Sequence, residues 1–266
     1  MAKLASLWIG GELSPLEQVS AASFAAQNDD LIIYSYKPLQ SLPKGVENRD
    51  ALEVWNESRI LRFRNGSPAP HADLFRYRLM RETERTWVDL DIIALRSFEF
   101  GNDYVFGLQD ERVVGSGVLR LPGDSRTTQA LNELSLDTVG YPKHFSMARK
   151  AKWQIRTGFK GLPIAEWRWA WTGPYLLTHL LKIHGEFQHA LPKETFYKVD
   201  DVRKFLEPDG LRVESYSSDC YGAHFWGSQI RSLLRSDFSD TIPKDSFLGW
   251  AMQEFLKVSA PASHAC

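Results

Sequence analysis

The pattern of the first 35 residues constrains the fold most, because it is typical of a β-α-β unit. Residues 4–9 and 31–35 are apolar runs of the length of a buried strand. Between them, Ser14-Pro-Leu-Glu17 combines a capping box with proline at the first helical position, which predicts a helix to about residue 28. Two buried strands joined by a helix favour a parallel sheet with helices on both faces. We therefore predict an α/β fold.

The rest of the chain mixes helical and strand patterns. In the segment 71–82, Ala72, Phe75 and Leu79 are spaced three and four apart, as on the core face of a helix. The other predicted helices are at residues 127–134, 174–184, 199–206 and 247–257, and the predicted strands are at 86–88, 104–106 and 113–121. Residues 42–70 are rich in Pro, Gly and Asn and are predicted to be a loop. Without a repeat or a long linker, residues 1–266 are predicted to form one domain.

Composition excludes several classes of protein. The chain has 32 Lys and Arg against 33 Asp and Glu, a formal net charge of -1, so binding to a nucleic-acid backbone is not expected. No apolar run approaches the roughly 20 residues of a transmembrane helix, and the N-terminus lacks the pattern of a signal peptide. The two cysteines, Cys220 and Cys266, are too few for a disulfide framework. We expect a cytoplasmic protein.

Two carboxylates follow the predicted strand at 86–88. A turn at a strand end can bring the side chains of Asp89 and Asp91 onto one cation, and oxygen ligands suit Mn²⁺ or Mg²⁺. Upstream, Asp73 and Arg76 lie at i and i+3 on one face of the predicted helix. Asp73 could accept hydrogen bonds from sugar hydroxyls and Arg76 could hold a sugar hydroxyl or a phosphate, or the two could form only a local ion pair. In the same way, Asp89 and Asp91 could simply lie in a solvated turn.

Taken together, several motifs resemble a family of DXD-containing glycosyltransferases. The segments are Trp8-Ile-Gly-Gly11, Tyr34-Ser-Tyr36, His71-Ala-Asp-Leu-Phe-Arg76, Trp87-Val-Asp-Leu-Asp91, Gly173-Pro-Tyr-Leu-Leu-Thr178 and Ala223-His-Phe-Trp-Gly-Ser228. The family includes bacterial capsular-polysaccharide sugar transferases and the eukaryotic globotriaosylceramide synthase and α-1,4-N-acetylglucosaminyltransferase group. The resemblance implies a GT-A fold with a Rossmann-type mixed sheet, a UDP-sugar donor, a divalent metal usually given as Mn²⁺, and retention of anomeric configuration.

The resemblance also implies residue roles. Asp91 would ligate the metal directly, and Asp89 would contact the ribose or the metal. Asp73 and Arg76 would hold the donor sugar and diphosphate. His224 would be a metal or diphosphate contact. Trp226 and Ser228 would close over the phosphates. The uracil and ribose would be bordered by Trp8, Ile9, Gly10 and Tyr36.

The chain departs from the family pattern at two positions. Glu84-Arg85-Thr86 fills a turn where the family commonly has a Gly-Gly pair, and Arg112-Val-Val-Gly-Ser-Gly117 stands where members often carry an Asn. Retention needs either a carboxylate nucleophile or same-face attack. Asp110 and Glu111 are available carboxylates, but a solvated or structural role is preferred for this loop pair, so no nucleophile is assigned.

Two further features allow alternative interpretations. Trp167, Trp169 and Trp171 alternate with the period of a strand, which predicts three indoles on one face, preferably a buried face and alternatively a platform for an acceptor. Residues 141–165 contain six Lys and Arg and no acidic residue, which indicates a solvated basic face or, alternatively, contact with anionic lipid. Cys220 is expected to be a buried thiol.

We therefore predict a metal-dependent retaining enzyme that moves a hexose or N-acetylhexosamine from a UDP-sugar to a glycan or lipid-linked acceptor. The eukaryotic relatives are typically anchored in the Golgi, whereas this chain resembles a cytoplasmic, bacterial-type member that could touch the inner membrane face. A catalytically weak nucleotide-sugar or glycan binding module, supported by the changed turn before Trp87, is the main alternative. A metal-dependent phosphohydrolase is a third.

Overall fold

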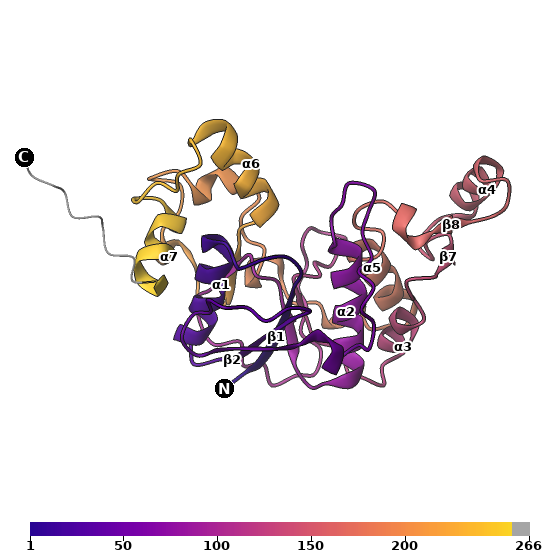
Figure 1. Ribbon diagram of the computed structural model, residues 1–266, viewed down its shortest axis with the longest axis horizontal. Coiled ribbons are helices and arrows are strands. Elements are labelled where there is room, and N and C mark those ends of the chain that lie inside the picture. The colour runs from indigo at the N-terminus through magenta and orange to yellow at the C-terminus, as the bar shows by residue number, and fades with distance from the viewer. Residues whose placement is uncertain (257–266) are drawn as a thin grey trace, which may run out of the picture.

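A computed structural model describes residues 1–256 of the chain, and its centre is a five-stranded mixed sheet (Figure 1). The strand order is β3-β2-β1-β4-β6. The strands are β1 (Lys3–Trp8), β2 (Asp30–Ser35), β3 (Val46–Asp50), β4 (Thr86–Val88) and β6 (Val118–Leu119). The first four run parallel and β6 is antiparallel to β4, so the predicted α/β fold with a Rossmann-like sheet is confirmed.

Helices cover both faces of this sheet, as predicted. The α-helices are α1 (Pro15–Ala26), α2 (Ala69–Glu82), α3 (Arg126–Asn132), α4 (Met147–Arg156), α5 (Pro174–Ile183), α6 (Gly227–Asp237) and α7 (Phe247–Leu256). Because strand side chains alternate between faces, Leu4 and Leu31 pack with Phe24 of α1, whereas Ala5 on the opposite face packs with Phe75 of α2. The core is therefore divided by the sheet into two apolar layers.

The start of α1 follows the predicted capping box. The carboxylate of Glu17 accepts a hydrogen bond from the backbone N–H of Ser14 at 3.1 Å and another from the Ser14 hydroxyl. Pro15 occupies the first helical position, where its missing N–H would be unpaired anyway. The helix ends at Ala26, two residues before the predicted end.

A second, two-stranded sheet joins the C-terminal part of the chain to the region after β4. Its strands are β5 (Ile92–Ala94) and β9 (Gly222–His224), which pair antiparallel with Ile92 opposite His224. Helix α6 follows β9 directly, and α7 packs against α1. This pairing matters for the site because it brings His224 next to the segment that follows β4.

Several sequence predictions were wrong in detail. Only Val118–Leu119 of the predicted strand 113–121 pairs in a sheet; on either side of it, Val114 and Arg120 form isolated bridges to Leu108 and Val105. Residues 104–106 form only an isolated bridge, Val105 to Arg120. The predicted helix 199–206 is a short 3-10 turn, Val202–Phe205. The loop predicted at 42–70 contains β3.

The prediction that three tryptophans share one face of a strand was also wrong. A 3-10 turn at Ile164–Glu166 precedes them and Ala170 adopts a left-handed φ of 67°, so the alternation of a strand is lost. Trp167 and Trp171 are buried, whereas Trp169 is 66% exposed. The predicted last helix, 247–257, is confirmed to Leu256, and Lys257 and Cys266 lie outside the described residues. The single domain over 1–266 stays a prediction.

Candidate metal centre and cleft

Three side chains that could hold a metal ion meet at the carboxyl end of β4. Asp89 and Asp91 follow this strand, and His224 is the last residue of β9. The backbone holds them in place: the N–H of Asp89 donates to the carbonyl of Gly117 at 2.7 Å, and the carbonyl of Asp91 accepts from the N–H of Phe225 at 2.9 Å. One ligand atom from each of the three lies within 4.8 Å of the others. The carboxyl end of a parallel strand is where α/β sheets commonly bind ligands.

Each carboxylate has a different set of partners. Asp89 accepts from the indole N–H of Trp87 at 2.7 Å and from Arg76 at 3.2 Å. Asp91 accepts from the backbone N–H of Gly227, the first residue of α6, at 2.9 Å, and its other oxygen lies 3.2 Å from Nε2 of His224. The N-terminal N–H groups of a helix attract an anion, so Asp91 also fixes the start of α6.

These surroundings move the pKa values apart. Burial raises the pKa of Asp89 above its ordinary value, although Arg76 opposes this. Burial acts on Asp91 in the same way, but His224 and the Gly227 N–H outweigh it and the pKa of Asp91 is lowered. Burial disfavours the imidazolium of His224, yet the Asp91 carboxylate raises the pKa of His224 above its usual value. The two shifts have the same cause, because each group favours the charged form of the other.

The donor set fits a divalent cation. Oδ1 of Asp91 is buried and accepts no hydrogen bond, apart from its 3.2 Å ion-pair contact with Nε2 of His224. A Cβ added at Gly117 would lie 3.1 Å from Oδ2 of Asp89 and 3.1 Å from Nε2 of His224, so glycine leaves open the space that these two atoms face. Two carboxylates and an imidazole suit Mn²⁺ better than Mg²⁺, which prefers oxygen ligands. The predicted group for a metal is thus present, and the identity of the metal stays a prediction.

A hollow of about 220 Å³ opens beside this group, which we call the cleft. Asp73 and Arg76 of α2 line it, as do Trp226 and Ser228 at the start of α6. Asp73 accepts from the hydroxyl of Thr172 at 2.6 Å, and burial raises the pKa of Asp73. The structure therefore brings the predicted sugar and phosphate contacts to the same cleft as the carboxylates.

Arg76 is held more tightly than the sequence indicates. Its guanidinium is almost fully buried, donates to the carbonyl of Ser116 and to Asp89, and stacks 4.6 Å from the ring centre of Trp87. Its distance to Asp73 is 3.6 Å, so the local ion pair expected from the spacing is also present. Nε of Arg76 is buried without a partner. The guanidinium of Arg76 therefore compensates the charge of Asp89 directly.

The start of α6 has an unusual backbone. Trp226 has a left-handed φ of 52°, which is costly for a bulky residue, and its ring lies 4.2 Å from that of His224. This conformation turns the chain so that His224 and Ser228 both reach the cleft. Backbone strain of this kind is concentrated at functional sites.

A second hollow, of about 180 Å³, borders the same carboxylates, and we call it the β1 hollow. Trp8, Glu17 and Arg231 line it together with Asp89 and Asp91, which also line the cleft. Arg231 is 41% exposed in its side chain and pairs with Glu17 at 2.6 Å. The two carboxylates thus form a wall between two hollows.

Only one of the four predicted uracil and ribose contacts, Trp8, lines a hollow. Ile9 and Tyr36 pack instead against the core on the α2 face of the sheet. The hydroxyl of Tyr36 is bound to the ring of His71 at 2.6 Å, because α2 passes beside it. A Cβ at Gly10 would lie 3.7 Å from the indole of Trp8, so Gly10 lies beside that ring.

Sequence reasoning missed several residues of the site. Tyr197 lines the cleft and its hydroxyl accepts from the N–H of Gly117 at 3.1 Å, but it lies in a segment without a motif. Gln109, and not the neighbouring Asp110, lines the cleft. Asp110 accepts from two backbone N–H groups of its own turn, which confirms the structural role preferred for it. Trp169 also lines the cleft, where a buried stripe was expected.

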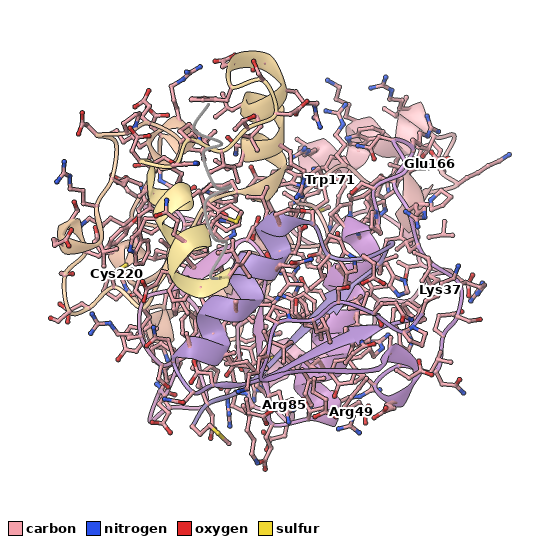
Figure 2. All side chains as sticks on the ribbon, turned by 60° about the vertical axis from the view of Figure 1, so that its left-hand side comes forward. Lys37, Arg49, Arg85, Glu166, Trp171 and Cys220 are labelled. Carbon is pink, nitrogen blue, oxygen red and sulfur yellow. The ribbon has the colours of Figure 1, made fainter. Side chains whose placement is uncertain are left out.

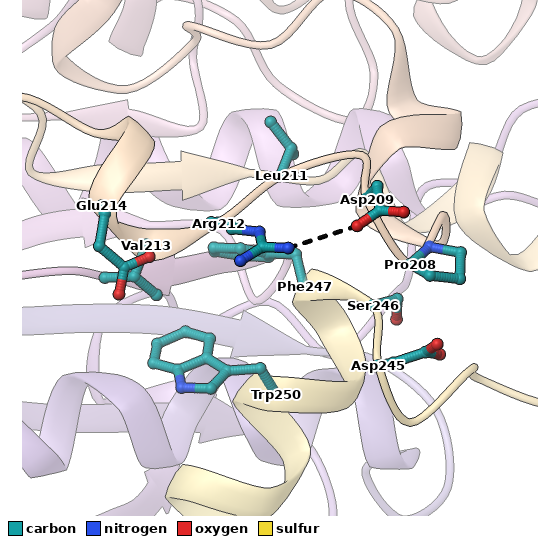
Figure 3. A pocket seen from close by; sticks show the side chains of 10 residues that line it. All are labelled: Pro208, Asp209, Leu211, Arg212, Val213, Glu214, Asp245, Ser246, Phe247 and Trp250. Atoms are coloured by element: carbon teal, nitrogen blue, oxygen red, sulfur yellow. Dashed lines mark hydrogen bonds and ion pairs between the residues drawn. The ribbon is translucent and has the colours of Figure 1, made fainter.

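A larger hollow, of about 380 Å³, lies away from these residues between α7 and the segment before β9 (Figure 3). Its ion pair, Arg212 to Asp209 at 3.3 Å, is exposed to solvent, and Trp250 forms part of its wall. It is thus a surface depression without buried charge, and size alone does not make it the functional site.

No family model matches the sequence, and no curated protein matches it. None of the helices formed by residues 1–256 has the length and hydrophobicity of a membrane-spanning segment.

Proposed function

We propose that the protein is a metal-dependent retaining glycosyltransferase with a GT-A fold and a UDP-sugar donor. The observation that carries this proposal is the group of Asp89, Asp91 and His224 at the carboxyl end of β4, between two hollows. A nucleotide-sugar has two parts joined by a diphosphate, and this arrangement offers a compartment for each part with a cation site between them. The family resemblance of the motifs points the same way.

The residues around each hollow suit different parts of the donor. In the β1 hollow, the indole of Trp8 offers a flat surface for a base, and Arg231 offers a cation to a phosphate. In the cleft, the Asp73 carboxylate is held by Thr172 and can accept hydrogen bonds from sugar hydroxyls. The nucleoside is therefore assigned to the β1 hollow and the donor sugar to the cleft.

The chemistry needs positive charge next to the leaving phosphate. Asp89, Asp91 and His224 would hold a Mn²⁺ ion, which would neutralise the charge that develops on the diphosphate. Arg76 is the fixed cation of the cleft and stabilises negative charge without reorganising, because Ser116 and Trp87 hold it. The carboxylates of the cleft are those of Asp73 and the metal pair. Same-face attack, in which the leaving phosphate accepts the acceptor's proton, fits this lining because it requires no enzymatic nucleophile.

The changed turn before β4 does not favour the alternative of a pure binding module. Arg85 in that turn pairs with Asp30 at 2.8 Å and donates to the carbonyl of Leu4 at 3.1 Å (Figure 2). Asp30 is the first residue of β2, so this turn lies at the amino end of the strands, whereas the metal group follows their carboxyl end. Its replacement affects the base of the sheet and leaves the site residues unchanged.

The proposal is tested by incubating the protein with Mn²⁺ and a panel of UDP-sugars and measuring UDP release. Release of UDP with free or transferred sugar is expected, and chelation of the metal should abolish it. Sugar phosphate as the product would identify a phosphohydrolase instead, and binding of UDP without any release would identify a binding module.

A matched pair of variants locates the chemistry. Asp91→Asn removes a ligand charge but keeps an oxygen that can accept from the Gly227 N–H, so the fold should be retained. It is expected to lose metal-dependent UDP release. Asp110→Asn makes the same change outside the cleft and should behave like the wild type. Full activity of Asp91→Asn with Mn²⁺ present would refute the metal assignment.

A further inference from the structure

A separate feature projects from the body of the molecule, and we call it the limb, residues 139–168 (Figure 1). Its neck is the antiparallel pair β7 (Val139–Gly140) and β8 (Leu162–Pro163), and helix α4 lies between these strands. None of the residues of α4 is buried, although the helix has ten residues. A helix without a buried side chain is not stabilised by packing in the core, so its surface is expected to have another role.

One side of α4 faces the body through aromatic contacts. The ring of Trp153 lies 5.9 Å from that of Trp171, which stands where the limb meets the body (Figure 2). Phe145 packs edge-on against the same indole at 4.7 Å, and the guanidinium of Arg149 lies 4.1 Å from the ring centre of Phe145. These contacts fix which side of the helix points outward.

The outward side carries exposed apolar residues. Met147, Ala151 and Ile155 are spaced four apart and so lie on one face of the helix. Met147 is 81% exposed and Ile155 73%, and Phe159 just beyond the helix is 74% exposed. Phe159 has a left-handed φ of 64°, which is unfavourable for a bulky residue and keeps it at the tip. Apolar side chains gathered in this way indicate an interaction surface.

Basic side chains surround this apolar face. Lys150 and Lys152 flank it on the helix, and Lys160 follows Phe159. Arg149 and Arg156 lie on the other side, 4.1 Å from the ring centre of Phe145 and 5.2 Å from that of Trp153. None of these five side chains forms an ion pair with an acidic residue within 1–256. The segment 141–165 has no acidic residue at all. The charge is therefore uncompensated locally, even though the whole chain is close to neutral.

We propose that the limb docks onto an anionic lipid bilayer. The basic side chains would meet the phosphates of the headgroups, and Met147, Ile155 and Phe159 would enter the boundary between headgroups and acyl chains. The positive charge favours an anionic partner over a neutral one. The apolar face favours a bilayer over a nucleic acid, because a nucleic-acid backbone has no apolar region into which these side chains could insert. The exposed apolar face is our reason for proposing the lipid alternative instead of the solvated basic face preferred from the sequence.

The limb also leads directly to the cleft. Trp169 follows the limb in the chain, is largely exposed and lines the cleft. This arrangement would suit a lipid-linked acceptor, but the docking does not depend on the proposed activity. It is therefore tested by binding alone.

The test is co-sedimentation of the full chain with vesicles of phosphatidylcholine, with and without phosphatidylglycerol. Binding only to the anionic vesicles is expected, and it should weaken with salt. Lys150→Glu with Lys152→Glu should lower the affinity about 30-fold or more, since each basic residue near an anionic surface contributes about a factor of five. Lys204→Glu, an exposed lysine in another part of the chain, should leave binding unchanged.

A second pair of variants tests the apolar face. Ile155→Glu with Phe159→Glu should lower vesicle affinity about tenfold or more, because partial burial of both side chains is lost. Ile183→Glu places the same change on α5 at a similarly exposed position and should have no effect. All variants should keep the wild-type melting temperature, because none of the changed side chains is buried.

Three results would overturn the proposal. The first is absence of binding to anionic vesicles at low salt. The second is wild-type vesicle binding by the Ile155 and Phe159 double variant together with equal affinity for heparin, which would identify a general polyanion surface. The third is a dimer in sedimentation velocity that this double variant disrupts, which would mean that a second copy covers the limb.

Discussion

His71 should make the stability of the protein depend on pH. The imidazole is fully buried at the start of α2, its Nδ1 accepts from the N–H of Leu61 at 3.3 Å, and its ring stacks on Trp55 with 4.9 Å between the centres. Since Nδ1 accepts, Nε2 carries the proton and donates to the hydroxyl of Tyr36 at 2.6 Å. A second proton would have to displace the Leu61 N–H. Burial accordingly lowers the pKa of His71 to about 4.

The magnitude follows from the difference between the two states. The pKa of His71 is about 4 in the folded protein against 6.5 for an ordinary histidine, and each unit corresponds to about 1.4 kcal/mol, so the full effect is about 3 kcal/mol. Between pH 6.5 and pH 4 the unfolded chain binds more protons than the folded one. The free energy of unfolding therefore falls as the pH is lowered, by about 2 kcal/mol from pH 7 to pH 5.

Urea denaturation at several pH values would measure this effect against His71→Gln. Glutamine can still accept from Leu61 and donate to Tyr36, but it does not titrate. The difference in unfolding free energy between wild type and variant should shrink by about 2 kcal/mol between pH 7 and pH 5. Parallel pH profiles would refute the reasoning, as would an NMR titration of the His71 ring with an ordinary midpoint.

Three further outcomes can be expected from the geometry. Gly117→Ala should weaken Mn²⁺ binding about 10- to 100-fold in calorimetry, because the added methyl group crowds Asp89 and His224. Gly11→Ala is the control, since nothing lies within 4 Å of its new Cβ, and it should bind Mn²⁺ like the wild type. Equal Mn²⁺ affinities of the two variants would place the ion elsewhere. Thr172→Val should lower the unfolding free energy in urea by about 1–3 kcal/mol, because a buried oxygen of Asp73 loses its donor; an unchanged midpoint would contradict this. Cys220 is fully buried and burial raises the pKa of its thiol to about 11, so a disulfide reagent at pH 8 should modify it only after denaturant is added; rapid modification of the native protein at this residue would contradict its burial.

The sheet was predictable where local signals and burial agree. The apolar runs that became β1 and β2, and the capping box of α1, needed no information from the rest of the chain. Strand β3 was not predicted, because it is an edge strand that pairs only with β2 and its sequence, Val46-Glu-Asn-Arg-Asp50, is mostly polar. Helix α4 was not predicted, although Met147, Ala151 and Ile155 recur every four residues, because the basic residues of this segment were interpreted only as a surface.

The site was predictable in its ligands and less so in its walls. Asp89 and Asp91 are close in sequence, and the resemblance of the segment around His224 brought in the third ligand. Tyr197 and Arg231 reach the site only through tertiary packing, and no local pattern marks them. The positions of Ile9 and Tyr36 were misjudged because residues after a strand can turn either toward the cleft or into the core.

The wall that Asp89 and Asp91 form between the cleft and the β1 hollow has a thermodynamic consequence. If a molecule bound in one hollow, it would contact the same carboxylates that a molecule in the other hollow would contact. The two occupants are therefore linked, and by reciprocity each must alter the affinity of the other by the same factor. Since Asp91 also accepts from the first N–H of α6, the start of that helix should shift when either hollow is filled.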